Sequence, residues 1–292
     1  WIERDINKYL NKLLGTTNED FVIASDTDSI YVTFDKLVNQ VFQEGSDVQK
    51  IVNFLDTIAQ EKIEPFIDKS YQNLASYVSA YDQKMFMKRE VIADKGIWTA
   101  KKRYILNAWD VEGVRYKEPS LKIMGIEAVK SSTPAPCREK IKEALKIIMS
   151  DDEKELNTFI QDFRNEFNNL PVEDIAYPRS VNGLGKFRDS ASIYRKGTPM
   201  HIKGSLIYNH LISEKKLNAK YPYIQEGDKI KFIQLKQPNP LGANVISFMT
   251  KVPKELDIHK YIDYDTQYEK AFVEPLSFIT DNINWSIDRS YG

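Results

Sequence analysis

Two aspartates, Asp26 and Asp28, stand one residue apart between two runs of strand-forming residues, in the stretch FVIASDTDSIYV at positions 21–32. Residues i and i+2 of an extended segment project to the same side, so the two carboxylates would lie close together. Two such charges repel each other unless a positive group neutralises them. Mg²⁺ or Mn²⁺ would do so, because both ions prefer carboxylate and water oxygens as ligands.

The same residues also suit an ordinary tight turn, since Asp and Ser side chains hydrogen-bond to their own backbone in turns. The apolar strands on both sides favour a turn that is held rigidly on a sheet, where paired carboxylates would be well fixed. The spacing by itself therefore supports a divalent-metal site and a plain turn about equally.

A basic run follows further along the chain, between residues 84 and 103. It contains seven basic side chains against two acidic ones, a local net charge of +5; they are Lys84, Lys88, Arg89, Lys95, Lys101, Lys102 and Arg103 against Glu90 and Asp94. The whole protein has 41 basic and 42 acidic residues and a formal charge of -1, so any polyanion must bind a local patch. The run could bind phosphate groups of a nucleic acid or could be a solvated charged face.

The composition sets broader limits. With 292 residues, 42% of them hydrophobic, the chain can fill the cores of one large or two ordinary domains. The single cysteine, Cys137, excludes an intramolecular disulfide and a cysteine-based zinc site. No apolar run is long enough to span a membrane, so we expect no membrane partner and a cytoplasmic location. The chain begins at Trp1 in what reads as a helix, which indicates a piece of a longer protein.

The elements that must position the two aspartates are a helix and a hairpin. Apolar residues at helical spacing predict a helix over residues 1–14 that ends at Gly15, followed by strands over 21–25 and 29–34. A helical region is expected over residues 47–79, which Pro65 should kink or divide. Strands over 84–116 would then complete an α+β sheet layer.

The second half of the chain has a different pattern of apolar and turn-forming residues. We expect a domain boundary near residue 131, where Ser131 to Pro134 carry a helix-start signal. Helices are predicted over residues 141–149, 151–170 and 257–272. Past residue 171, Pro, Gly and Asn interrupt short apolar runs such as 201–212, which read as surface strands and loops, and residues 238–242 form a loop.

Several blocks together carry a resemblance to a known family. The run Asp26-Thr27-Asp28-Ser29 is similar to the palm motif Y-G-D-T-D-S of family B DNA polymerases, and Lys101-Lys102-Arg103-Tyr104 looks like their K-K-x-Y motif. Other blocks resemble the branch of that family found in T-even-type bacteriophages; they are MFMKRE at 85–90, LKIMG at 121–125, KSSTP at 130–134, HIKG at 201–204, EGDK at 226–229 and EKAF at 269–272 followed by Pro275 and Leu276. The resemblance covers nearly the whole chain.

This resemblance implies an α+β fold, with the C-terminal part of a palm, a sheet with packed helices, over residues 1–131. A mixed, mostly helical thumb would follow over residues 132–292. It also implies template-directed nucleotidyl transfer with two Mg²⁺ ions, for which Mn²⁺ could substitute. Asp28 would be the principal metal ligand, Asp26 its supporting carboxylate and Glu90 a nearby third carboxylate.

The resemblance further implies a surface that binds primer-template DNA. Lys101, Lys102, Arg103 and Tyr104 would lie near the growing end of the primer, with cations on phosphates. Further DNA contacts are expected from Thr27, Lys130, Lys203 and Tyr208.

Some parts of the family pattern are absent or altered. No segment resembles the other palm motif, D-x-x-S-L-Y-P, which carries the partner metal-binding aspartate, or the fingers helix K-x-x-x-N-S-x-Y-G, which binds the deoxynucleoside triphosphate. An exonuclease domain is likewise absent, so the chain is expected to be inactive until an N-terminal polymerase half joins it. Ala24 and Ser25 replace the usual Tyr-Gly, and Lys88 stands where the phage relatives have a carboxylate. The ending at 288–292 lacks the apolar tail that usually binds a sliding clamp, a further partner of the family.

Two other readings stay open. The chain could be a non-catalytic module that binds primer-template duplex, or a scaffold subunit, with a polymerase-like fold. It could also be a metal-binding α+β protein of unrelated function, in which case the ordered series of blocks would be coincidence.

Overall fold

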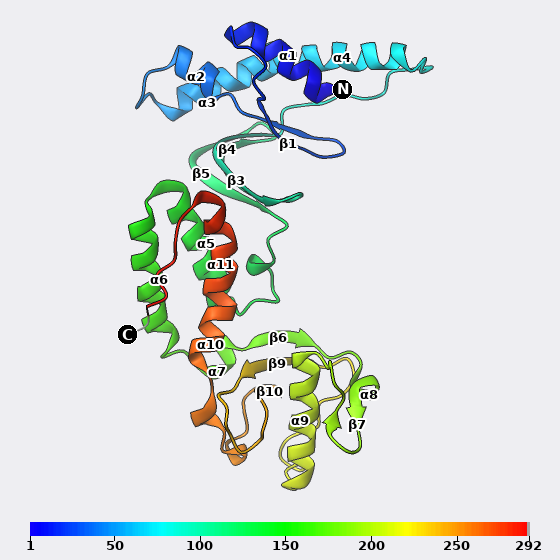
Figure 1. Ribbon diagram of the computed structural model, residues 1–292, viewed down its shortest axis with the longest axis vertical. Helices are drawn as coiled ribbons and strands as arrows, with labels where there is room; N and C mark the ends of the chain where they lie inside the picture. Colours follow the sequence, from blue (N-terminus) through cyan, green and yellow to red (C-terminus); the bar gives the residue numbers. More distant parts are fainter. Residues whose placement is uncertain (291–292) are drawn as a thin grey trace. The chain divides into compact units, whose positions relative to one another are not determined.

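The computed structural model describes residues 1–290, which form two compact units, Trp1–Gly125 and the part from Ile126 onward. Both units combine helices with antiparallel sheets, so the expected α+β class is confirmed (Figure 1). The division falls close to the boundary that the sequence places near residue 131. Residues 291 and 292, the end of the stretch compared with the clamp-binding tail, lie outside the described part.

Helices build one layer of the first unit. They are α1 (Ile2–Leu14), α2 (Asp35–Val41), α3 (Val48–Ile58), a π-helical turn (Ala59–Ile63) and α4 (Glu64–Tyr77). The apolar face of α1 is buried through Ile2, Ile6, Leu10 and Leu14 against α4, the π-helical turn and the start of the hairpin. Gly15 ends α1 in a left-handed conformation, as expected.

The region from 47 to 79 is helical and is divided, as expected. Pro65 lies in the first turn of α4, and the division falls immediately before it, at the π-helical turn Ala59–Ile63, one turn of wider winding. The short helix α2 lies outside every predicted element.

The strands of the first unit form two sheets. β1 (Val22–Ser25) and β2 (Ile30–Val32) make an antiparallel hairpin, while β3 (Val91–Ala100), β4 (Arg103–Val111) and β5 (Val114–Met124) form a sheet in that order. Residues 84–90, which were predicted as strand, are irregular. Some of their backbone groups bond to side chains: the Arg89 N–H donates to Glu64 at 2.7 Å and the Met85 N–H to Gln83 at 2.5 Å.

A buried charge network fastens the start of β3. The Asp110 carboxylate on β4, 1% exposed, accepts hydrogen bonds from Arg89 and from Arg115 Nε, the latter at 2.9 Å. Arg89 also binds Asp56 on α3 at 2.7 Å. Burial disfavours the charge on Asp110, but hydrogen bonds from Arg115 and Arg89 outweigh it and hold the pKa of Asp110 below its usual range. The network joins α3, β4, β5 and the segment before β3.

The second unit packs helices on a three-stranded sheet. Its longer helices are α5 (Ala135–Ser150), α6 (Glu153–Phe167), α9 (Met200–Glu214), α10 (Tyr264–Tyr268) and α11 (Glu274–Thr280), with a π-helical turn (Glu269–Val273) between the last two. Its strands are β6 (Tyr177–Ser180), β7 (Arg188–Asp189), β8 (Ile193–Tyr194), β9 (Lys229–Gln234) and β10 (Val245–Phe248), and the sheet order is β10-β9-β6. Short helices are η2 (Glu127–Val129), α7 (Val172–Ile175), α8 (Leu184–Phe187), η3 (Lys254–Leu256), η4 (His259–Tyr261) and η6 (Asp281–Ile283).

Aromatic side chains fill the helical core of this unit. Phe163 and Phe167 on α6 pack against Tyr268 and Phe272, with ring centroids 4.8 to 5.8 Å apart. The helices predicted over 141–149 and 151–170 are present with shifted ends. The helix predicted over 257–272 is instead η4, α10 and the π-helical turn in succession.

The apolar run at 201–212 is a helix, so its interpretation as surface strand or loop was wrong. Helix α9 is buried on most sides through residues that include Ile202, Ser205 and Ile212, and a helix buried all round shows no alternation of apolar and polar residues. Gly204 allows the close approach of β10, because a Cβ there would lie 2.4 Å from Ser247 Oγ. Within residues 1–290, no helix is long and apolar enough to cross a membrane.

Candidate active site

The two aspartates lie at the tip of the β1–β2 hairpin. Ser25 pairs with Ile30, and the Asp26 N–H donates to the Ser29 carbonyl at 2.8 Å, so Asp26 to Ser29 form a tight turn. None of these four residues has a positive φ, so the turn does not need glycine. The carboxylates thus belong to a turn and not to an extended strand, and the argument from strand spacing does not apply to them.

The two carboxylates have different surroundings. Asp26 Oδ1 accepts a hydrogen bond from the Thr27 N–H at 2.8 Å, and the Thr27 hydroxyl lies 3.4 Å from the same oxygen. Asp28 is exposed. One carboxylate is therefore anchored within the turn while the other projects into solvent.

The basic residues Lys101, Lys102 and Arg103 lie at the turn between β3 and β4. Ala100 pairs with Arg103, so Lys101 and Lys102 alone make the connection, and all three cationic residues are exposed. Lys102 has a φ of 62°, which lets a two-residue connection close. Gly125, itself at φ 70°, lies against this turn, because a Cβ on it would be 2.5 Å from the Lys102 carbonyl oxygen.

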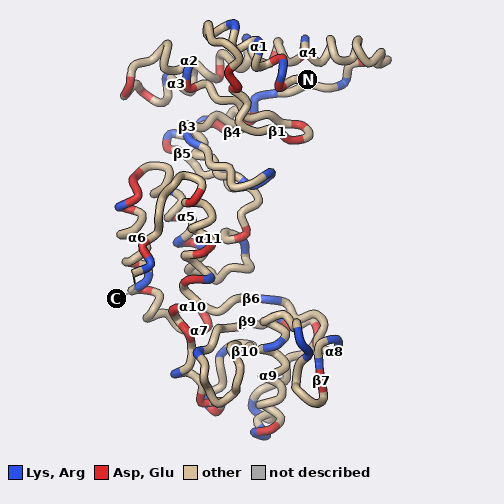
Figure 2. Tube along the Cα trace, in the orientation of Figure 1, with Lys and Arg blue, Asp and Glu red and all other residues tan. Residues whose placement is uncertain are grey.

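The acidic turn and the basic turn meet. Lys102 Nζ is 3.8 Å from Asp26 Oδ1, with side chains 64% and 28% exposed. An ion pair this exposed contributes little to folding stability, at most about 1 kcal/mol. It shows that residues more than seventy positions apart in the sequence share one surface, with acidic residues at the hairpin tip and basic residues beside them (Figure 2).

Three aromatic rings hold the two turns together. The ring of Tyr31 on β2 lies 5.4 Å from Trp98 on β3 and 5.2 Å from Tyr104 on β4, and Trp98 and Tyr104 are 6.0 Å apart. Tyr104, expected to contact DNA, is only 6% exposed. Burial and a hydrogen bond with Tyr104 raise the pKa of Tyr31 to about 12, so this phenol stays neutral at physiological pH. We name Tyr31, Trp98 and Tyr104 the aromatic cluster.

Glu90 lies just before β3, and its carboxylate binds Lys122 Nζ at 2.5 Å. Lys122, on β5, also places its positive charge near Tyr31, where it favours the ionised phenol slightly. Lys122 is a neighbour of the site that sequence reasoning missed, although it lies in the block LKIMG. Within residues 1–290, no group of three or more His, Cys, Asp or Glu side chains is arranged to hold a metal ion.

Asp26 and Asp28 nevertheless fit part of a magnesium site. Mg²⁺ is commonly bound through one or two protein carboxylates, with waters and substrate phosphates as its other ligands. The donor set suits a site that is completed by groups from elsewhere.

The other expected DNA contacts belong to both units. Thr27 is exposed in the acidic turn, and Lys130, in the second unit, pairs with Glu127 at 2.7 Å. Lys203 donates to Asn244 Oδ1 at 3.0 Å and lies over the ring of Tyr194. Tyr208 is 2% exposed, and its hydroxyl donates to the Pro222 carbonyl, so it belongs to the core and not to a DNA surface.

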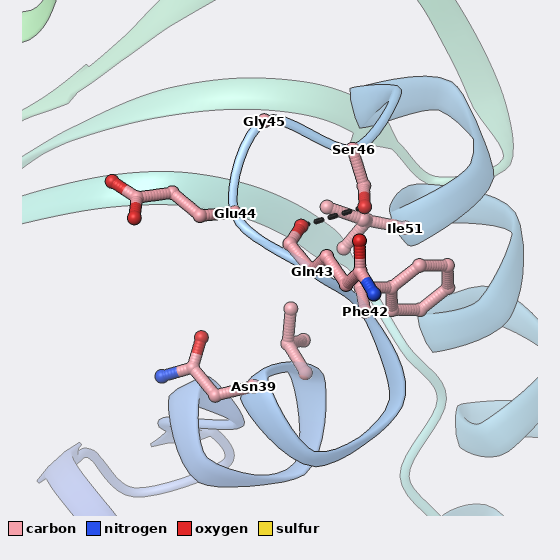
Figure 3. A pocket seen from close by; sticks show the side chains of 8 residues that line it. Asn39, Phe42, Gln43, Glu44, Gly45, Ser46 and Ile51 are labelled. Atoms are coloured by element: carbon pink, nitrogen blue, oxygen red, sulfur yellow. Dashed lines mark hydrogen bonds between the residues drawn. The ribbon is translucent and has the colours of Figure 1, made fainter.

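A pocket of about 710 Å³ opens elsewhere in the first unit, between α2 and the start of α3 (Figure 3). Val38, Phe42 and Ile51 supply its apolar wall, and Asn39, Gln43 and Glu44 its polar side chains. None of the predicted site residues lines it. The candidate site, the surface of the two turns, is therefore distinct from this pocket.

Comparison with known proteins confirms the resemblance carried by the motifs: over nearly its whole length, the chain is homologous to DNA-directed DNA polymerases of bacteriophages. It is 40% identical over 294 residues to the DNA-directed DNA polymerase of Escherichia phage RB69, a match of 96% of this chain and 32% of that protein. It is 37% identical over 293 residues to the DNA-directed DNA polymerase of Enterobacteria phage T4, covering 95% of this chain. The chain thus spans about a third of the length of these relatives. No protein-family model matches it.

Proposed function

We propose that the chain is the C-terminal palm and thumb portion of a phage-type, family B DNA polymerase. It takes part in template-directed nucleotidyl transfer to a DNA primer, in the cytoplasm of the infected host cell. Residues 1–131 form the palm part and residues 132–292 the thumb. The N-terminal polymerase half supplies the exonuclease, the other palm motif and the fingers, and activity requires it.

One observation supports this proposal above the others. The acidic turn and the basic turn, which match two separate polymerase motifs, converge with Lys102 Nζ 3.8 Å from Asp26. Nucleotidyl transfer at a primer end needs carboxylates for divalent metal and cations for backbone phosphates at one place. The two turns offer both kinds of group.

Each group has a defined part in this proposal. Two Mg²⁺ ions, when bound, would lower the pKa of the primer 3′-hydroxyl and stabilise charge on the triphosphate. Asp28, the exposed carboxylate, would hold metal directly, and Asp26 would support it from its anchored position in the turn. Lys101, Lys102 and Arg103 would bind primer-template phosphates. Glu90, paired with Lys122, would orient groups near the site without binding metal.

The aromatic cluster would hold the acidic and basic turns in position and would not contact the substrate. Tyr104 is buried, so it cannot reach DNA from its present position. With Tyr31 and Trp98 it fixes the distance between the carboxylates and the cations. We therefore assign it a positioning role.

Primer extension tests the proposal. The chain is mixed with a polypeptide that carries the missing motifs, together with primer-template, deoxynucleoside triphosphates and Mg²⁺. We expect extension only when both polypeptides and the metal are present. Equal extension by the N-terminal polypeptide without this chain would refute the proposal.

A second candidate is a non-catalytic duplex-binding module. It is favoured by the exposed basic turn, Lys101 to Arg103, which could bind DNA phosphates without any metal. It predicts that the chain binds primer-template equally well with Mg²⁺ or EDTA, that affinity falls as salt rises, and that no partner restores extension. The extension assay therefore separates the two candidates.

A further inference from the structure

Large apolar side chains gather on the surface where α4 ends and the chain turns back. Five of them lie within ten residues: Tyr77 is 77% exposed, Val78 58%, Tyr81 107%, Met85 53% and Phe86 72%. We call these five residues the apolar strip. Helix α4 extends past the N-terminal end of α1 before the chain returns (Figure 1). Concentrated apolar exposure of this kind is typical of interaction surfaces.

The backbone beneath the strip is held in place. The Gln83 side chain bonds to both backbone groups of Met85, accepting from its N–H at 2.5 Å. The Ala80 N–H donates to the Ala75 carbonyl at 2.8 Å, which ends α4. Met87, just beyond the strip, packs on the core of the first unit. An ordered backbone thus presents these side chains outward.

The start of α1 supports the same surface. The Trp1 indole N–H donates to the Ser70 carbonyl at 3.1 Å, and the Trp1 ring lies 5.5 Å from the ring of Tyr77. Trp1 is itself 39% exposed and continues the apolar surface.

The chemistry of the strip favours a polypeptide occupant over DNA. Within residues 77–86 the charged residues are Asp82 and Lys84, whose charges cancel, so the strip itself offers no row of cations for phosphates. Tyr, Phe and Met are the residue types enriched at the centre of protein interfaces.

The part of the relatives that this chain does not match is the occupant that we infer. Since the chain matches only 32% of the RB69 polymerase, about two thirds of such an enzyme lies outside it. We infer that the apolar strip is the surface on which this remaining part of the polymerase packs, through an apolar face of its own. The inference rests on the proposed function, because it supposes a complete polymerase.

Hydrogen exchange and binding together test the inference. The probe is a polypeptide containing the part of the RB69 polymerase outside the match, added to the full chain. We expect slower amide exchange over residues 74–88 in the mixture than in the chain alone. The double variant Tyr81→Asp, Phe86→Asp should weaken binding at least tenfold, as for central interface residues. The control variant Phe278→Asp, at a 64% exposed side chain in the second unit, should change binding less than twofold.

The outcomes separate the two claims. If the mixture extends primers while the strip stays unprotected and the double variant binds like the wild type, the inference is wrong and the proposed function stands. If the strip is protected but no Mg²⁺-dependent extension occurs, the packing surface is supported while the catalytic part of the proposed function fails. Absence of any complex overturns the inference. So does self-association of the chain alone that the double variant abolishes, since a second copy would then occupy the strip.

Discussion

At the scale of single residues, the site depends on two short turns whose side chains differ in freedom. Asp26 is fixed by the Thr27 N–H and faces Lys102, while Asp28 is exposed. Lys102 stands at a positive φ and Gly125 lies directly against its carbonyl oxygen. The position of the basic turn therefore depends on a residue that has no side chain.

Replacing Gly125 tests this dependence. Gly125→Ala should lower the free energy of unfolding by about 2–3 kcal/mol, because it combines a left-handed backbone with a Cβ against the Lys102 carbonyl. It should also weaken primer-template binding, since the basic turn must shift. Both quantities are measurable by urea denaturation and fluorescence anisotropy.

Gly113→Ala is the matched control, because Gly113 has a φ of 87° and a Cβ there would meet nothing within 4 Å. Gly113→Ala should lower the free energy of unfolding by only about 1 kcal/mol, the strain of a left-handed backbone, and should leave DNA affinity unchanged. Equal effects of the two substitutions would show that Gly125 does not support the turn.

The cations of the basic turn make a separate prediction about salt. Lys102→Ala should reduce the slope of log K against log salt for primer-template binding by about 0.9, the value for one lost phosphate contact. Lys50→Ala, at an exposed lysine on α3, is the control and should leave the slope unchanged. An unaltered slope for Lys102→Ala would remove this residue from the DNA surface.

At the scale of elements, two buried features hold the turns where they are. The aromatic cluster ties β2 to β3 and β4 beside the turns, and the charge network around Asp110 ties α3 to the sheet. The sequence shows neither, because each depends on side chains that meet only after the strands have paired.

The charge network predicts a dependence of stability on pH. The pKa of Asp110 is depressed in the folded protein, so its stabilising contribution is present above the unfolded carboxyl's value of 3.8 and is lost as pH falls through the lower folded pKa. Asp110→Asn should cost about 3 kcal/mol at pH 7, since it leaves Arg89 and Arg115 without their buried partner.

Urea denaturation between pH 2.5 and 7 measures both effects. The unfolding free energy of Asp110→Asn should fall less steeply at acid pH than that of the wild type. Asp68→Asn, at an exposed aspartate on α4, should follow the wild-type curve. A parallel fall for the wild type and Asp110→Asn would show that Asp110 does not titrate with folding.

The predictability of the fold follows from how each element is buried. Helix α1 and the β1–β2 hairpin were predicted because each has one buried face and clear ends, at Gly15 and at the turn. Helix α9 was not, because it is buried on most sides and lacks a helical period. The strand predicted over 84–90 is absent. Side chains bond to its backbone there: Glu64, distant in sequence, accepts from the Arg89 N–H, and the neighbouring Gln83 accepts from the Met85 N–H.

The candidate site was predictable in part for similar reasons. The acidic and basic turns are short, local motifs that sequence displays directly. Other features depend on how the folded chain packs. Tyr104 and Tyr208 are buried, and Lys122 forms an ion pair with Glu90. The family resemblance placed Tyr104 and Tyr208 on the DNA, but Tyr104 on β4 and Tyr208 on α9 are both buried.

At the scale of the whole molecule, the chain is neutral, yet its first unit concentrates cations near a pair of carboxylates. With a formal charge of -1 the chain has no overall attraction to DNA, so the DNA binding that we propose would depend on local surfaces such as the basic turn. The relatives are about three times as long as this chain. Under the proposed function, the N-terminal polymerase half would supply the metal ligands that Asp26 and Asp28 lack.

The most direct test of this account is the effect of Asp28→Ala on Mg²⁺-dependent primer extension by the chain and its N-terminal partner polypeptide. We predict a rate loss of about a thousandfold with primer-template affinity unchanged, because Asp28 would act on the metal and not on the duplex. Asp68→Ala, the exposed control on α4, should extend at the wild-type rate. Undiminished extension by Asp28→Ala would contradict the claim that this turn holds the catalytic metal.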